Sequence, residues 1–250
     1  MSNLFNNNFD TKQKRFVGDV RTLFNNTIEE YHLIKENDKI AVGLSGGKDS
    51  MTLLHLFAFR KKYLQKNFEF DAVYVNVENA DYKINFDQVK EFCDNLEVKL
   101  IVRNVLLNDE RNAENRCFIC SLARRKNLFD FTKELGYNKL ALGHNMDDAV
   151  ETLMMNMVYH GKYCSIPPYL SMFDGRLSLI RPLLKVTKEQ TFEYSVLHNF
   201  PQIKSECGFE HLSARNKFRN FADYLEKLNR GAKKNIFSSM SNIYEDYIVK

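Results

Sequence analysis

The residues best suited to hold a phosphate chain form one short run, Ser45-Gly46-Gly47-Lys48-Asp49-Ser50. Two adjacent glycines let backbone N–H groups turn toward an anion, and a helix that follows them adds its positive N-terminal end. Lys48 adds a point charge, and the Asp49 carboxylate suits a Mg²⁺ ion that accompanies phosphate. The spacing is too short for the Gly-x-x-x-x-Gly-Lys-Ser/Thr motif. Because a predicted strand precedes the run and a predicted helix follows it, we interpret it as a nucleotide-phosphate loop rather than a glycine turn with incidental polar neighbours.

A second polar run is expected to follow another strand, at Leu142-Gly143-His144-Asn145-Met146-Asp147-Asp148. It places a small residue, an imidazole and two carboxylates at the sheet edge where the first run lies. A helix N-terminus also favours carboxylates, so Asp147 and Asp148 are equally explained as capping and first-turn residues. The pairing with the first run favours the second half of one nucleotide site.

Two cysteines three residues apart, Cys117 and Cys120, bring two thiolates within reach of one metal ion. Two ligands do not close a metal site. Cys207 is the best third candidate, because the glycine after it lets the backbone approach a metal closely. Cys164 is less well placed, and Cys93 is expected to fill the core as a small residue inside a helix.

Three thiolates suit either zinc with a fourth ligand such as His144 or an Fe₄S₄ cluster with one iron left open. A redox-active dithiol and a purely structural pair are further interpretations of the same spacing. The residues alone leave all of these open. Disulfides are not expected, because the number of cysteines is odd and the chain is typical of the cytosol.

No run approaches the roughly 18 apolar residues that span a bilayer, and the N-terminus lacks the basic and apolar regions of a signal peptide. We therefore expect a cytoplasmic protein without a membrane partner. The formal net charge of +4 is modest but uneven. Between Leu212 and Lys234 there are seven basic residues and two acidic ones, and a second basic cluster consists of Lys12, Lys14, Arg15 and Arg21. Such clusters indicate either solvated helix faces or contacts to nucleic-acid phosphates.

Short apolar stretches alternate with amphipathic ones through the middle of the chain. Strands are predicted at 39–44, 70–77, 98–105 and 139–143. Helices are predicted at 50–66, 86–96, 117–135 and 147–159. This alternation predicts an α/β fold, a doubly wound parallel sheet that binds ligands at the carboxyl ends of its strands. Both polar runs leave those ends.

The same pattern divides the chain into four parts. Residues 1–11 are asparagine-rich and predicted to be disordered, and 12–36 form an N-terminal helix. Residues 37–185 form the nucleotide-binding α/β domain, with a further strand at 177–182. Residues 186–250 form a C-terminal helical region, in which one helix is predicted to bury Phe218, Phe221, Ala222, Leu225 and Leu228.

Taken together, these motifs resemble a known superfamily. Ser-Gly-Gly-Lys-Asp-Ser is similar to the PP-loop of the ATP pyrophosphatases, which cleave ATP between its α- and β-phosphates and pass AMP to an oxygen of the substrate. With Cys-x-x-Cys, Gly-His-x-x-Asp-Asp and a late cysteine before glycine, the chain resembles the tRNA 2-thiocytidine synthetases of the TtcA type. The resemblance extends over residues 12–242.

The resemblance implies a role for each motif residue. ATP would be bound by Ser45, Gly46, Gly47, Lys48, Asp49, Ser50, Arg124, Gly143, His144 and Asp148, with Mg²⁺ on Asp49. The catalytic set would be Asp49 with the ligands of an Fe₄S₄ cluster, Cys117, Cys120 and Cys207. The residues implied to contact tRNA are Arg215, Lys217, Arg219 and Arg230. The family carries one further cysteine where this chain has Lys204, which still leaves three thiols.

The implied activity is ATP-dependent tRNA thiolation, in which the C2 oxygen of a cytidine is adenylated and replaced by sulfur with release of AMP and pyrophosphate. The implied partners are tRNA and a sulfur donor such as a cysteine desulfurase, and homodimers are common in the family. One alternative is another tRNA-modifying PP-loop enzyme, which thiolates a different base or forms lysidine. Others are a non-catalytic ATP- and RNA-binding module, and a redox protein that uses Cys117 and Cys120 alone.

Overall fold

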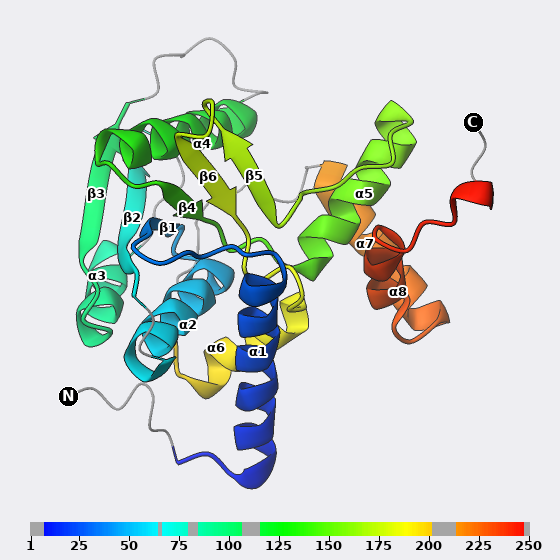
Figure 1. The fold of residues 1–250 in the computed structure, drawn as a ribbon, viewed down its shortest axis with the longest axis horizontal. Coiled ribbons are helices and arrows are strands. Elements are labelled where there is room, and N and C mark those ends of the chain that lie inside the picture. The colour runs from blue at the N-terminus through cyan, green and yellow to red at the C-terminus, as the bar shows by residue number, and fades with distance from the viewer. Residues whose placement is uncertain (1–7, 65–66, 80–84, 107–115, 202–213, 248–250) are drawn as a thin grey trace.

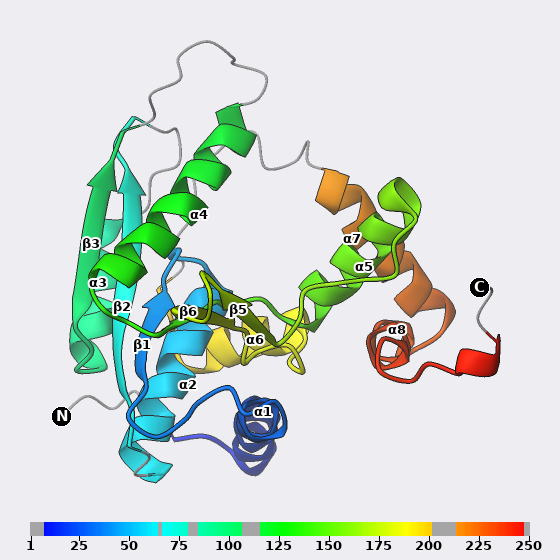
Figure 2. The same ribbon diagram turned by 45° about the horizontal axis from the view of Figure 1, so that its top comes forward.

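The computed structural model describes residues 8–64, 67–79, 85–106, 116–201 and 214–247, apart from the side chains of 116–118 and 214 (Figure 1). In this part of the chain, helices cover both faces of a six-stranded sheet, and a further group of helices extends to one side (Figure 1 and Figure 2). Most of the predicted disordered start, 1–11, lies outside the described residues, and its last residue, Thr11, begins a helix.

The strands of the sheet are β1 (Lys39–Gly43), β2 (Glu69–Val77), β3 (Leu100–Val105), β4 (Lys139–Ala141), β5 (Tyr169–Met172) and β6 (Leu177–Ile180). They lie in the order β3-β2-β1-β4-β6-β5. Neighbouring strands run parallel, except that β5 and β6 pair antiparallel. The predicted doubly wound sheet is confirmed, and its antiparallel edge strand is an addition. The sequence does not predict β5, because its four residues do not alternate between apolar and polar side chains.

The helices of the sheet body are α1 (Thr11–Glu30), α2 (Lys48–Leu64), α3 (Phe86–Asn95), α4 (Arg116–Glu134) and α6 (Lys188–Leu197). Ile40 and Val42 of β1 pack in a core shared with α1, α2, α3 and α6. Ala41, between them, faces α4 together with Val73 and Leu140. The central strands are therefore apolar on both faces, as buried parallel strands require.

The N-terminal helix is shorter than the predicted range 12–36, since α1 ends at Glu30. It begins with a capping box in which Asp10 and Gln13 each accept the other's backbone N–H. It ends where the chain turns and His32 takes a positive φ of 48°. A second turn, at Asn37 with a φ of 63°, then leads into β1.

A second group of helices contains α5 (Met146–His160), α7 (Ala214–Leu228) and α8 (Ala232–Ser239), followed by the short 3-10 helix η4 (Glu245–Tyr247). Phe218 and Ala222 of α7 pack against α5. The predicted buried stripe of α7 is wrong at two positions, because Phe221 and Leu228 are 51% and 65% exposed. Phe218 and Ala222 are the positions that meet α5, and Phe221 and Leu228 lie away from that contact. None of the helices described in Figure 1 is both long and apolar enough to cross a membrane.

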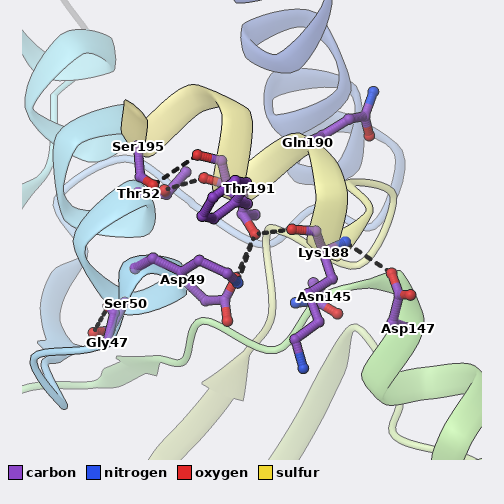
Figure 3. A network of polar contacts seen from close by, with 12 residues as sticks. Gly47, Asp49, Ser50, Thr52, Asn145, Asp147, Lys188, Gln190, Thr191 and Ser195 are labelled. Atoms are coloured by element: carbon purple, nitrogen blue, oxygen red, sulfur yellow. Dashed lines mark hydrogen bonds and ion pairs between the residues drawn. The ribbon is translucent and has the colours of Figure 1, made fainter. Parts of the chain in front are cut away.

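Helix α6 belongs to the sheet body by its contacts, although the predicted boundary at 186 assigns it to the C-terminal region. Its Tyr194 is fully buried, and the Tyr194 hydroxyl lies 3.0 Å from Nδ1 of His55 in α2. This packing brings the first turn of α6 beside the first turn of α2 (Figure 3). The four-part division of the chain stays a prediction.

Candidate active site

The first polar run forms a tight loop between β1 and α2. Leu44 donates its N–H to a carbonyl of β2 at 2.9 Å, which extends the sheet by one residue. Gly46 takes a positive φ of 80°, a conformation that favours glycine. The Ser50 hydroxyl donates to the Gly47 carbonyl at 2.8 Å and accepts the Ser45 N–H at 3.1 Å. These bonds fix the turn that brings the N-terminal end of α2 to the carboxyl edge of the sheet.

The second polar run lies directly against the first. Its strand, β4, is the parallel neighbour of β1, so both runs leave the same edge of the sheet. A Cβ added to Gly143 would come within 3.0 Å of backbone atoms of Asp49 and Ser50. A side chain at residue 143 would therefore displace the first turn of α2. Glycine is what lets the two runs touch.

A cavity of about 420 Å³ opens between the two runs, α4 and α7. Its lining includes six residues that the sequence assigns to ATP binding, Ser45, Asp49, Ser50, Arg124, Gly143 and His144. The described lining does not include the other four, Gly46, Gly47, Lys48 and Asp148. Arg125 and Arg215 also line the cavity. Together with Arg124 they make it basic, which suits a triphosphate.

The backbone edge of β2 provides a further polar wall of this cavity. The pairing of β1 with β2 ends at Gly43 and Val73, whereas β2 continues beside β3 to Val77. The Val73 carbonyl accepts a hydrogen bond from Leu44, at the end of β1. Backbone groups of successive residues in a strand point to opposite sides, so the N–H and C=O of Val75 point to the same side as those of Val73, beyond the end of β1. Val75 lines the cavity. Its adjacent donor and acceptor match the hydrogen-bonding edge of a nucleobase.

Asp49 lies in a triangle of polar groups at the start of α2. Lys48 Nζ is 2.7 Å from Asp49 Oδ1 and 3.2 Å from the hydroxyl of Thr191 in α6. The Thr191 hydroxyl also donates to Asp49 Oδ1, as Figure 3 shows. Both Lys48 and Asp49 therefore contact α6 as well as the phosphate loop.

The two carboxylates of the second run both accept backbone N–H groups. Asp148 forms a capping box with Asn145, accepting the Asn145 N–H at 3.0 Å while its own N–H bonds the Asn145 side chain at 3.1 Å. Asp147 accepts the Lys188 N–H at 2.7 Å (Figure 3). It also accepts the Lys233 ammonium at 2.7 Å. Asp147 thus ties the first turn of α5 to the first turns of α6 and α8. A nucleotide or metal contact at Asp148 stays a prediction.

His144 is a half-buried imidazole in the cavity wall. Its Nδ1 has no hydrogen-bond partner in the described structure. Burial lowers the pKa of His144 to about 4, and the positive charges of Arg181 and Arg215 act in the same direction against the opposing effect of Asp148. The ring is therefore neutral at pH 7 and adds a hydrogen-bonding group without adding charge.

The four residues assigned to tRNA contact separate into two pairs. Arg215 and Arg219 turn toward α5, where their Nε atoms lie 3.7 and 3.0 Å from the carboxylate of Glu151. Glu151 is 1% exposed, and burial raises its pKa while Arg219 lowers it. Lys217 and Arg230 are instead exposed, on α7 and on the turn that follows it. The second pair is the more exposed of the two.

The structure describes the predicted cluster ligands in part. Cys120 is 7% exposed and packs against Val77, one residue before Ser121 of the cavity wall. Cys117 lies in the first turn of α4 with its side chain outside the description, and Cys207 lies outside the described residues. Among the side chains that are described, no three of His, Cys, Asp or Glu gather as a metal site.

The two remaining cysteines occupy different surroundings. Cys93 is fully buried, as predicted for a core residue, and burial raises the pKa of its thiol to about 12. Cys164 is exposed, and its Sγ accepts a hydrogen bond from Asn156. The raised pKa keeps Cys93 as an inert thiol, whereas Cys164 is accessible.

A parallel α/β sheet with a phosphate loop of this form after its first strand defines a PP-loop domain, and the sequence matches the PP-loop domain family over residues 13–222. The chain is 33% identical over 249 residues to the tRNA-cytidine(32) 2-sulfurtransferase of Alcanivorax borkumensis, covering 94% of this chain and 86% of that protein. It is 32% identical over 246 residues to that of Cytophaga hutchinsonii, covering 95% and 85%. The chain therefore belongs to the PP-loop family and, within it, to the tRNA-cytidine(32) 2-sulfurtransferases.

A solved structure agrees with this membership. The fold is similar to that of the U34-tRNA thiolase NcsA from Methanococcus maripaludis with its [4Fe-4S] cluster. The TM-score is 0.73 at 26% identity, and the match covers 94% of this chain and 80% of that one.

The sequence does not reveal the contribution of α6 and α8 to the site. Thr187 and Gln190 form a capping box, and this Thr-x-x-Gln signal is sufficient to locate the start of α6. It gives no indication that Thr191 meets Asp49, or that Lys188 and Lys233 meet Asp147. Those contacts depend on how α6 and α8 pack.

Proposed function

We propose that this chain catalyses ATP-dependent tRNA thiolation, in which the C2 oxygen of a cytidine is adenylated and then replaced by sulfur to give 2-thiocytidine. The observation that carries the proposal is the contact of the two polar runs at Gly143, on the wall of one basic cavity. This cavity is lined by the phosphate loop, a neutral imidazole and three arginines. The substrate class comes from the relatives, which are named for tRNA cytidine 32.

ATP would lie across the cavity with its pyrophosphate against residues 45–50. The N-terminal end of α2 and the Lys48 ammonium would stabilise the negative charge that grows on the leaving pyrophosphate. Arg124, one helical turn after Cys120, would contact the phosphates from α4. The adenine edge would bond the backbone N–H and C=O of Val75.

The chemistry balances without oxidation or reduction. In the first step the cytidine C2 oxygen forms a bond to the α-phosphorus of ATP, and the bond from that phosphorus to pyrophosphate breaks. The adenylated oxygen is then a good leaving group. In the second step a sulfur nucleophile at the oxidation level of sulfide bonds to C2, and AMP leaves with the original oxygen. His144, neutral at pH 7, and the cavity arginines would bind the AMP portion through both steps.

Two inorganic groups are part of the proposal. Asp49 suits Mg²⁺, because its carboxylate lines the cavity and its Oδ2 accepts no hydrogen bond from any described residue. For the cluster, Cys120 is buried beside the cavity wall and Cys117 lies one turn before it, with Cys207 proposed as the third ligand. When bound, an Fe₄S₄ cluster with three protein thiolates supplies an open iron position for a sulfur species.

Exposed cations on α7 and the turn after it would bind the tRNA. Lys217 and Arg230 are accessible to RNA phosphates, which position a substrate without reading its sequence. Arg215 and Arg219 were assigned the same role, and by their contacts they would hold α7 on α5 beside the cavity. We also propose a cytoplasmic setting, a sulfur donor such as a cysteine desulfurase, and a homodimer.

The test is a product analysis. The protein is purified without oxygen, reconstituted with iron and sulfide, and incubated with Mg-ATP, sulfide and unmodified tRNA, and the digested nucleosides are identified by mass spectrometry. We expect 2-thiocytidine from the wild type and none from Cys207→Ala. Cys164→Ala is the matched control, since this exposed cysteine lies outside the proposed ligand set and should leave the yield unchanged.

Two other outcomes separate the alternatives. AMP without any thionucleoside would contradict thiolation and leave a PP-loop enzyme with another nucleophile. A thiolated uridine would favour a second candidate, thiolation of U34, for which NcsA is named and which the similarity of the two folds supports.

A further inference from the structure

Thr191 stands out because a buried hydroxyl from α6 reaches the first turn of α2. The residue is fully buried, and its backbone carbonyl lies 3.5 Å from the hydroxyl of Thr52 in α2. Helix α6 begins at Thr187 with its own capping box, so the position of Thr191 one turn later is set by the packing of α6 on α2. Figure 3 shows its side chain directed at Asp49.

The hydroxyl has two charged neighbours. A threonine hydroxyl donates one hydrogen and accepts at two lone pairs. Lys48 Nζ, 3.2 Å away, can only donate to the hydroxyl. The hydroxyl proton has two acceptors within reach, the Lys188 carbonyl at 3.0 Å and the Asp49 carboxylate, and the contact with the charged carboxylate is the shorter one. Neighbouring residues of a helix do not normally face each other, yet Lys48 Nζ lies 2.7 Å from Asp49 Oδ1. The hydroxyl of Thr191 contacts both of these charged groups.

Both contacts end on the same carboxylate oxygen. Thr191 and Lys48 each donate to Oδ1 of Asp49, while Oδ2 accepts no hydrogen bond from any described residue. When ATP phosphates attract Lys48, the Thr191 hydroxyl is the group that still holds Oδ1. A carboxylate fixed through one oxygen presents the other oxygen in a defined direction.

We propose that Thr191 is a positioning residue that holds Oδ1 of Asp49 and thereby directs Oδ2 toward the divalent cation that accompanies the ATP phosphates. The inference rests on the proposed function in that it assumes binding of Mg-ATP at this loop. It adds a residue from outside both polar runs. It also assigns α6 a part in cation binding.

The test compares the affinity for α,β-methylene-ATP in excess Mg²⁺ and in EDTA by calorimetry. We expect Thr191→Val, which keeps the shape but removes the hydroxyl, to reduce the gain in affinity on adding Mg²⁺ about tenfold, as loss of a hydrogen bond to a charged group predicts. Binding in EDTA should stay within about twofold of the wild type. Thr191→Ser should restore the gain.

Thr27→Val is the matched control. Thr27 is also fully buried, but its hydroxyl donates to the Leu23 carbonyl inside α1, away from the loop. An unchanged Mg²⁺ gain in Thr191→Val would overturn the inference, and so would a Thr191→Ser variant as impaired as Thr191→Val. Equal weakening in Mg²⁺ and EDTA would assign Thr191 to packing alone. A wild type that binds no analogue would overturn the proposed function, and this inference with it.

Discussion

A Gly143→Ala variant is expected to form AMP with a kcat/KM about tenfold below that of the wild type, since a misplacement of about 1 Å at a reacting centre costs about 100-fold and this contact forces a shift of a few tenths of an ångström. The added Cβ would come within 3.0 Å of the Asp49 carbonyl group and the Ser50 nitrogen. These are backbone atoms of the first turn of α2, so no side-chain rotation relieves the contact. The phosphate loop and the second polar run must move apart, which misplaces the pyrophosphate against the α-phosphorus. The measurement is steady-state AMP formation with tRNA and sulfide present.

Gly18→Ala is the control for this substitution. Gly18 lies in α1, where an added Cβ would meet no atom within 4 Å. We expect it to retain full activity and to raise the free energy of unfolding by about 0.5–1 kcal/mol, because alanine favours a helix interior. A Gly143→Ala variant with wild-type kinetics would show that the two runs need not touch.

An Asp38→Ala variant is expected to lose about 3 kcal/mol of unfolding free energy, the scale of a buried ion pair with one partner removed. The Asp38 carboxylate lies 2.9 Å from Lys139 Nζ, and the two side chains are 6% and 5% exposed. It also accepts the Lys35 N–H at 2.6 Å and the Asn138 side-chain amide at 2.8 Å. Removing it leaves the Lys139 ammonium buried with the Leu33 carbonyl as a neutral partner. Because Lys139 begins β4 and Asp38 precedes β1, the loss falls on the two strands that carry the polar runs.

Chemical denaturation of Asp38→Ala and Glu69→Ala gives a matched comparison. Glu69 lies 4.0 Å from Lys39, with the two side chains 77% and 62% exposed, so breaking this pair should cost less than about 0.5 kcal/mol. Asp38→Asn, which keeps the shape and some hydrogen bonds, should fall between the two. Equal losses in Asp38→Ala and Glu69→Ala would contradict the structural role given to the buried pair.

The sequence predicts the sheet and the phosphate loop well because each is a local pattern. An apolar strand, two glycines and an amphipathic helix occur in sequence around Gly46 and Gly47, and their conformations need little help from distant residues. The second polar run is predicted for the same reason. Its place beside the first run follows from topology, because parallel strands bring their carboxyl ends to one edge.

What the sequence does not predict depends on packing between elements distant in the chain. Thr191 reaches Asp49 because α6 packs on α2, and nothing near Thr191 in the sequence indicates it. The open edge at Val75 exists because β1 stops before β2, a difference in length between two strands. Phe221 and Leu228 follow an apolar helical pattern, yet α7 meets α5 through Phe218 and Ala222 and leaves both of them exposed. The strand β5 is a four-residue edge strand, and its sequence does not alternate between apolar and polar residues.

The measurement that tests the central claim most directly follows the C2 oxygen. A tRNA carrying ¹⁸O at C2 of its target cytidine is incubated with the reconstituted protein, Mg-ATP and sulfide. The ¹⁸O content of the released AMP is then measured by mass spectrometry. If the C2 oxygen attacks the α-phosphorus in the cavity between the two polar runs, each 2-thiocytidine formed is matched by one AMP that carries the label. Thionucleoside formed alongside unlabelled AMP would contradict adenylation of the base, and with it the role assigned to this site.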